Sequence, residues 1–230
     1  MAIYLTKEKL YNEIHEYKRG LGLNATDIGF DMIELCVKDG VLLQKLPFKT
    51  KALRGMASIG STPKNDVILL NTDRSKREQN FDCGHEFVHL CIHRNLNQKT
   101  FNCIDTIYAR QDVFIEWQAN EGAAEMIVPM KIFLPFVKKN YSGDGYYANI
   151  IYLKEQAANM FNVTEKVIEC RLENLKYEIH QYLNGVPLND IEILSLSQQK
   201  RKKINIKSLN DIENESFNAC FADWHCLHSI

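Results

Sequence analysis

The chain has 230 residues, of which 45% are hydrophobic and 25% charged, a balance typical of a soluble globular protein with one main domain. Lysine and arginine number 28 against 29 aspartate and glutamate residues, so the formal net charge of -1 excludes a global electrostatic attraction to nucleic acid or acidic membranes. No stretch resembles a signal peptide or reaches membrane-spanning length, so we expect a cytoplasmic protein without a membrane partner.

Two amphipathic helices are predicted at the start of the chain. Residues 7–19 place Leu10 and Ile14 at helical spacing, and residues 27–38 repeat this pattern before Gly40 stops it.

Short apolar runs follow, and they predict three strands of a small sheet. The runs occupy residues 41–43, 56–59 and 67–70, and proline, glycine and asparagine separate them. Residues 54–59 are also a candidate sheet edge to which an extended peptide substrate adds. An ordinary buried strand accounts for the same residues equally well.

Helices dominate the rest of the predicted fold. Residues 76–94 lack proline and read as a largely buried helix, and a second helix over residues 113–128 ends at Pro129. Residues 147–183 read as two or three further helices, interrupted near Asn162. The fold class expected is therefore α+β, with helices around a small three-stranded sheet and a mainly helical C-terminal half.

The hydrophobic patterning fades beyond Gly185, which predicts one domain over residues 1–185 and a loosely attached tail over residues 186–230. The tail contains Cys220 and Cys226, whose crowded spacing lacks the two separated knuckles of a structural zinc site. All seven cysteines are scattered and odd in number, so we expect reduced thiols.

The segment from His85 to His89 fits the pattern H-E-x-x-H. Helical residues four apart have Cβ atoms about 5–6 Å apart, so two imidazoles at this spacing can bind one metal ion. Glu86 is turned by about 100° around the helix axis, where its carboxylate can act as a general base on water. A helix with two ordinary histidines is the alternative interpretation.

A catalytic zinc site needs a third protein ligand and one open position. His93 continues the same helical face, but three ligands along one helix would spread over about 12 Å, so we expect His93 to have a supporting or structural role. Glu116 lies 27 residues after His89 (116 − 89), on a helix that can run antiparallel to the first. Glu121 and Glu125 on that helix compete for the position, and an exposed glutamate at a helix start is an equally good account of Glu116.

Both segments resemble the ImmA/IrrE family of metallopeptidases, whose members show F-x-x-x-H-E-x-G-H-x-x-x-H followed by E-x-x-A-N-x-F-A-A-x-L-L-M-P. The corresponding segments are residues 81–93 and 116–129, and the resemblance extends more weakly over about residues 5–180. Three positions depart from the family pattern: Val88 replaces glycine, Gly122 replaces phenylalanine and Asn80 replaces arginine. The matching residues are Phe81, His85, Glu86, His89, His93, Glu116, Ala119, Asn120, Ala123, Ala124 and Pro129.

This resemblance implies a zincin-like fold with one zinc ion bound by His85, His89 and Glu116, and with Glu86 as the catalytic residue. It favours Glu116 over the two other glutamates. It also implies an anti-repressor activity, in which the substrate is a helix-turn-helix transcriptional repressor.

The function expected is that of a zinc-dependent endopeptidase acting on an intracellular protein. The alternative is a regulatory protein-binding or DNA-binding module with a structural or vestigial metal site, in which the helix-turn-helix-like residues 150–180 engage the partner. Direct nucleic-acid binding is disfavoured because four glutamates in that element would repel phosphates. Tyr108, Tyr146, Tyr147 and His93 are the candidate oxyanion donors, and the sequence does not indicate an oligomeric state.

Overall fold

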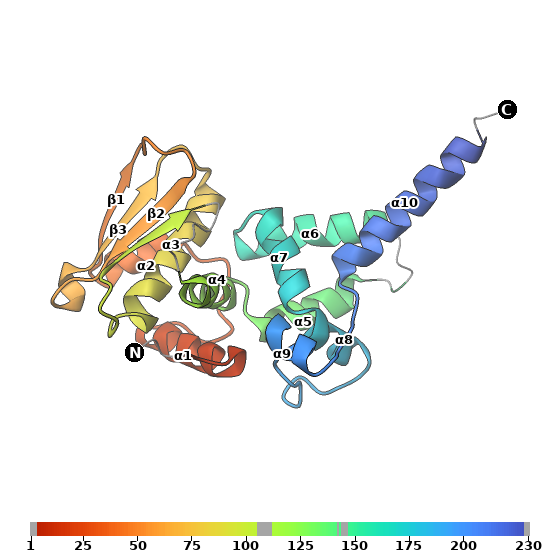
Figure 1. Cartoon of the computed structure of the whole chain (residues 1–230), viewed down its shortest axis with the longest axis horizontal. Helices are drawn as coiled ribbons and strands as arrows, with labels where there is room; N and C mark the ends of the chain where they lie inside the picture. Colours follow the sequence, from red (N-terminus) through yellow and green to blue (C-terminus); the bar gives the residue numbers. More distant parts are fainter. Residues whose placement is uncertain (1–3, 105–111, 142, 144–146, 228–230) are drawn as a thin grey trace. The chain divides into compact units, whose positions relative to one another are not determined.

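The computed structural model describes residues 4–104, 112–141, 143 and 147–227, with side chains omitted at residue 147 and from residue 219 onward. The chain forms two compact units: Met1–Pro129 with Phe161–Val163, and Met130–Met160 with Thr164–Ile230. Over the described residues the fold is α+β, with one sheet in the first unit and only helices in the second (Figure 1). The predicted fold class is confirmed.

The sheet has four strands among the described residues, one more than predicted. They are β1 (Leu42–Leu46), β2 (Leu53–Ser58), β3 (Val67–Asn71) and β4 (Thr100–Ile104). Their order is β1-β3-β2-β4, with β1 parallel to β3 and β2 antiparallel to both of its neighbours. Because β2 pairs on both sides, the prediction that residues 54–59 form an exposed edge is wrong.

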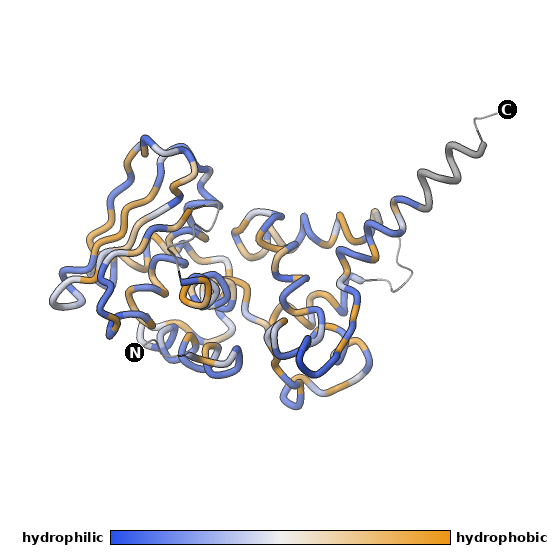
Figure 2. Tube along the Cα trace, in the orientation of Figure 1, coloured by the Kyte–Doolittle hydropathy of each residue, from blue (hydrophilic) through white to orange (hydrophobic). Residues whose placement is uncertain are grey.

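The helices of the first unit are layered on this sheet. They are α1 (Lys7–Gly20), α2 (Met32–Lys38), α3 (Lys76–Ile92) and α4 (Val113–Ile127), with a short 3-10 turn, η1 (Pro63–Asn65). The α3 helix packs on the sheet, α4 packs on α3, and α1 packs on α4 (Figure 1). The apolar stretches that drive this packing appear on the strands and on α4 in Figure 2.

Side-chain caps set where two of these helices begin. Ser75 and Glu78 form a capping box at the start of α3, which stabilises its first turn. The second predicted helix starts later than expected, at Met32, because the Asp31 carboxylate accepts a hydrogen bond from the Ile33 N–H at 2.8 Å.

The second unit contains α5 (Met130–Asn140), α6 (Tyr147–Phe161), α7 (Glu165–Asn174), α8 (Lys176–Leu183), α9 (Leu196–Arg201) and α10 (Leu209–Leu227). The predicted interruption near Asn162 is confirmed, because this residue has a positive φ of 54° and Thr164 caps α7. The α5 helix was not predicted, and it contains Pro135 in its interior.

Part of the predicted tail lies in helices that contact the rest of the second unit. The α10 helix packs on α7, and the Asn210 amide donates to the Glu169 carbonyl at 2.9 Å. The boundary at residue 185 and the loose attachment stay predictions, and the side chains of Cys220 and Cys226 lie outside the described residues. Within the described residues, none of the helices is both long and apolar enough to cross a membrane.

Candidate metal centre

Two imidazoles and one carboxylate converge between α3 and α4. The Nε2 atoms of His85 and His89 lie 3.1 Å apart, one helical turn from each other on α3. The Glu116 carboxylate on α4 reaches to 3.4 Å from His85 Nε2 and 3.9 Å from His89 Nε2. All three side chains are buried, so water does not screen their interaction.

This donor set fits a divalent cation such as zinc. Atoms that bind one tetrahedral zinc ion at about 2.0–2.1 Å lie about 3.3 Å from one another. The two Nε2 atoms, 3.1 Å apart, and the pair His85 Nε2 and Glu116 Oε2, 3.4 Å apart, are close to that value. Two imidazole nitrogens and one carboxylate oxygen also form the ligand set of a common class of catalytic zinc site. The residues present therefore fit the metal that the sequence predicts.

Asn120 orients the first imidazole. Its amide nitrogen donates to the Glu116 carbonyl oxygen at 3.0 Å, which directs its side-chain oxygen toward His85. That oxygen is 3.1 Å from His85 Nδ1 and can only accept a hydrogen bond, so Nδ1 carries the proton. The Nε2 lone pair of His85 is thereby left to face Glu116 and His89.

The second imidazole is held by ring stacking. The ring of His89 stacks on Phe101 of β4, with centroids 4.3 Å apart and an interplanar angle of 15°. Burial, together with the neighbouring His85 and His93, lowers the pKa of His89 well below its ordinary value. The neutral imidazole that results is the form that binds metals.

Glu86 is fully buried beside this cluster. Neither of its carboxylate oxygens accepts a hydrogen bond of normal geometry from a described residue. Burial, followed by the charges of Glu116 and Asp82, raises the pKa of Glu86 well above its ordinary value. Space for the carboxylate exists because Gly55 of β2 lacks a side chain: a Cβ atom there would lie 2.8 Å from Glu86 Oε1.

The two competing glutamates of α4 face α1. The Tyr11 hydroxyl donates a short hydrogen bond to Glu121, and His15 Nε2 lies 2.8 Å from the Glu125 carboxylate. Among the three candidate carboxylates, the structure thus brings Glu116 to the histidines and places the other two in the contact between α1 and α4.

Of the four candidate oxyanion donors, the structure describes the side chain of His93. Both ring nitrogens of His93 have partners, since Nδ1 lies 2.9 Å from His89 Nδ1 and Nε2 lies 3.1 Å from the Gln118 amide oxygen. His93 therefore has no free donor to offer. Tyr108, Tyr146 and the side chain of Tyr147 lie outside the described residues.

Sequence reasoning missed several residues that surround the cluster. Buried Asp82 accepts hydrogen bonds from Arg54 Nε at 2.9 Å and Arg74 Nε at 2.5 Å, which ties α3 to β2 and to the loop before α3. Buried Cys103 of β4 lies close to His85 and Glu86, with one ligand atom of each within 4.8 Å of the others. Apolar and polar residues alternate over residues 100–104, and this alternation is the sequence signal that could have placed Cys103 on a buried face. Nothing in the sequence marks Asp82.

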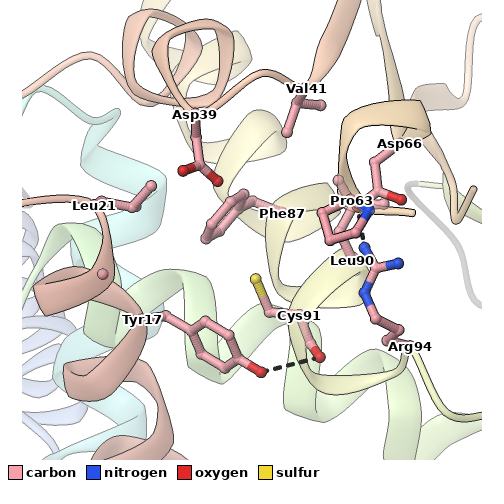
Figure 3. Close-up of a pocket in the computed structure, with 11 residues that line it drawn as sticks. Tyr17, Leu21, Asp39, Val41, Pro63, Asp66, Phe87, Leu90, Cys91 and Arg94 are labelled. Carbon is pink, nitrogen blue, oxygen red and sulfur yellow. Dashed lines mark hydrogen bonds and ion pairs between the residues drawn. The ribbon is translucent and has the colours of Figure 1, made fainter.

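A separate cavity of about 370 Å³ lies on the other side of α3 (Figure 3). Phe87, Leu90 and Cys91 line it from α3, and the Tyr17 hydroxyl at its rim donates to the Cys91 carbonyl at 3.2 Å. These α3 positions are turned by roughly 150° from the paired histidines, so the cavity does not open onto the cluster.

The cluster lies within a range of the chain that matches a known protein family. A peptidase M78 family model, described as the IrrE N-terminal-like domain, matches residues 36–173. The matched range contains every residue of the cluster. No curated protein matched the chain.

Proposed function

The chain belongs to the IrrE N-terminal-like peptidase family, and from that premise we propose that it is a zinc-dependent endopeptidase. Membership supports a metallopeptidase-type function and confirms the resemblance found in the sequence. In the proposed enzyme His85, His89 and Glu116 hold the zinc ion, and Glu86 is the general base.

The observation that carries this proposal is the convergence of three buried ligand atoms next to a buried carboxylate to which no described residue donates a hydrogen bond of normal geometry. Burying a carboxylate with so little hydrogen bonding costs free energy, which a purely structural site gains nothing from. Such a cost is expected where the group acts on a substrate. This is why we favour an enzyme over a module with a structural or vestigial metal site.

The bound zinc would supply Lewis acidity, polarising the scissile carbonyl and activating water for attack on it. Glu86 takes a proton from the attacking water and delivers it to the leaving amine nitrogen. Its place beside His85 on α3 brings it to the reacting atoms.

A substrate strand can pair with β4, which is an edge of the sheet among the described strands. Two residues of β4 point to the site: Phe101 stacks on His89, and Cys103 lies beside Glu86. An extended peptide added along β4 would run past the cluster. This role replaces the one predicted for residues 54–59.

We propose that the substrate is an intracellular protein, with a helix-turn-helix transcriptional repressor as the substrate that the family resemblance implies. The α6 and α7 helices carry the glutamates that disfavour a direct role in nucleic-acid binding.

The test compares wild-type protein with Glu86→Gln. Both should contain about one zinc per chain by elemental analysis, because Glu86 is not a ligand. Only the wild type should cleave a purified helix-turn-helix transcriptional repressor, and a chelator should stop that cleavage.

Glu13→Gln, an exposed change on α1, is the matched control and should cleave normally. Full activity of Glu86→Gln would refute the general-base role, and a wild type that binds no zinc would refute the enzyme. Salt-dependent DNA binding without cleavage would favour the regulatory module instead.

A further inference from the structure

The cavity beside α3 has the size and the lining of a small-molecule site. Its volume of about 370 Å³ falls in the range of roughly 300–1,000 Å³ that ligand pockets occupy in proteins. Its walls come from segments of the first unit that are far apart in the sequence. Such walls favour an apolar ligand body. The apolar part of the lining consists of Leu21 after α1, Val41 before β1, Pro63 of η1, and Phe87 and Leu90 of α3 (Figure 3).

Charged side chains line the same cavity, and two of them neutralise each other. Arg94 forms an ion pair with Asp66, which also accepts a hydrogen bond from the Gly60 N–H at 2.9 Å. The third charged residue of the lining is Asp39, which caps the C-terminal end of α2. The Asp39 carboxylate has no hydrogen bond or ion pair with any residue that the structure describes. The charge left uncompensated in the described lining is therefore negative.

The surroundings of this carboxylate suit a cation. Figure 3 shows the Asp39 carboxylate turned toward the ring of Phe87, and the ring of Tyr17 lines the same hollow. Partial burial raises the pKa of Asp39 above its ordinary value, because lost hydration is not offset by a positive charge. The faces of aromatic rings attract ammonium groups, and a carboxylate attracts them by its charge. An ammonium group in this cavity would therefore gain from both kinds of contact.

We propose that this cavity binds a small amphipathic amine, whose ammonium group pairs with Asp39 and whose apolar body lies against Leu21 and Leu90. An anion is disfavoured because Asp39 repels it and Arg94 is already paired with Asp66. A neutral apolar molecule would bury the Asp39 carboxylate further without a partner. The cavity lies apart from the candidate metal centre, so this inference goes beyond the proposed function and does not depend on it.

The first experiment titrates the whole chain with phenethylamine and follows the backbone amides by nitrogen-15 NMR. The amide signals of Val41, Phe87 and Leu90 should shift and reach saturation, which gives Kd. Phenethyl alcohol keeps the ring and the chain but lacks the charge. It should bind about 3-fold to 30-fold more weakly, the loss expected for one partly exposed ion pair and one cation–π contact. Equal affinities for the two probes, or no shifts at these amides, would overturn the proposal.

Two variants separate the charge of the cavity from its shape. Asp39→Asn changes an exposed residue and should lower the affinity for phenethylamine to that for phenethyl alcohol. Leu21→Trp fills the cavity from a half-buried position and should weaken the binding of both probes. Glu34→Gln removes an exposed acid of α2 and is the matched control, with wild-type binding expected. Unchanged phenethylamine binding in Asp39→Asn would overturn the proposal and leave an adventitious attraction to surface acids. Thermal unfolding checks that each variant is folded.

A third probe separates a free small molecule from a lysine side chain of another protein. Acetyl-lysine methylamide, with its side-chain amine free, carries the same ammonium group without a compact apolar body. It should bind more weakly than phenethylamine, because it makes less contact with the apolar lining. Tighter binding of the lysine derivative would overturn the assignment to a small molecule. None of these measurements uses zinc or cleavage, so their outcome is independent of whether the proposed peptidase function holds.

Discussion

Gly55 has no side chain where it faces Glu86, and the activity should depend on that space. An added Cβ would lie 2.8 Å from Oε1 and 3.1 Å from Cγ of Glu86, so the carboxylate must move. The backbone of Gly55 is not left-handed, so Gly55→Ala adds only this contact. We expect kcat/KM to fall by about 10-fold to 100-fold while zinc content stays unchanged.

Gly20→Ala is the matched control, because a Cβ at Gly20 meets nothing within 4 Å. Elemental analysis measures the zinc content of the wild type, Gly55→Ala and Gly20→Ala, and cleavage kinetics measure their kcat/KM. Normal kinetics for Gly55→Ala would show that the position of the Glu86 carboxylate does not limit the reaction.

The third metal ligand marks the part of the candidate site that the sequence alone cannot predict. The H-E-x-x-H spacing predicts His85, Glu86 and His89 as a unit, because four residues return to the same helical face. Glu116 and Glu125 lie on opposite faces of one helix, and periodicity cannot say which face meets α3. That choice depends on α1, which supplies His15 as the partner of Glu125.

The contact between α3 and α4 contains two departures from the family pattern, and the two positions face each other. Val88 is larger than the usual glycine, and Gly122 is smaller than the usual phenylalanine. A Cβ at Gly122 would meet both methyl groups of Val88, at 3.1 and 3.2 Å, and Ile14 Cδ1 of α1 at 3.2 Å. We therefore expect Val88 to occupy part of the space that a larger residue at position 122 would need.

A double-mutant cycle tests this exchange. Gly122→Val alone should lower the free energy of unfolding by about 1–3 kcal/mol through overpacking. The volume-conserving pair Val88→Gly with Gly122→Val should cost less than the sum of the two single changes, by about 0.5–3 kcal/mol. Urea unfolding gives the free energy of unfolding of the wild type, the two single variants and the double variant. Strictly additive changes in this free energy would contradict compensation.

The α1 helix carries a buried lysine whose charge makes stability depend on pH. Lys18 Nζ donates to the backbone carbonyls of Ala25 at 3.1 Å and Asp27 at 2.8 Å, and burial lowers its pKa from 10.5 to about 8. Between these two values the unfolded chain binds the proton more tightly than the folded chain does. The free energy of unfolding should therefore rise with pH from about 8 to 10 through this group.

Lys18→Met should remove that contribution, so the wild type minus variant difference in unfolding free energy should grow across this pH range. Lys9→Met, at an exposed position of α1, should leave the pH dependence unchanged. Equal slopes for Lys18→Met and the wild type would show that the lysine keeps its ordinary pKa.

Two elements escaped sequence-based prediction for physical reasons. β4 is short, and only Phe101 and Cys103 are buried in it, so its alternating pattern covers too few residues to separate it from a loop. The α5 helix contains Pro135, which normally ends or kinks a helix, and it begins directly after the proline that ends α4. Tertiary packing of buried Phe133 and Leu134 outweighs this local signal.

Zinc should link the two central helices of the first unit and so stabilise the folded state. The proposed ligands come from α3 and α4, and the unfolded chain does not hold them together. At free zinc about 100-fold above Kd, the gain should be about 2.7 kcal/mol.

Differential scanning calorimetry with zinc and with a chelator measures this stabilisation as a shift in Tm. His85→Ala should show the same Tm under both conditions, because it lacks one ligand. A zinc-dependent shift that survives in His85→Ala would place the stabilising ion elsewhere.

The first unit contains every described residue of the cluster, and the second unit contributes none of them. Among the described residues, the candidate metal centre therefore belongs to the first unit alone.

The chain order of the sheet also has a consequence during synthesis. β2 and β3 leave the ribosome before α3, but β4, which covers the other side of β2, follows only after α3 is complete. A nascent chain at that point holds the paired histidines beside an uncovered row of backbone N–H and C=O groups. The same strand that covers this edge of β2 brings Phe101 against His89, so the pairing of β2 on its second side and the stacking on the His89 ring are completed in one step.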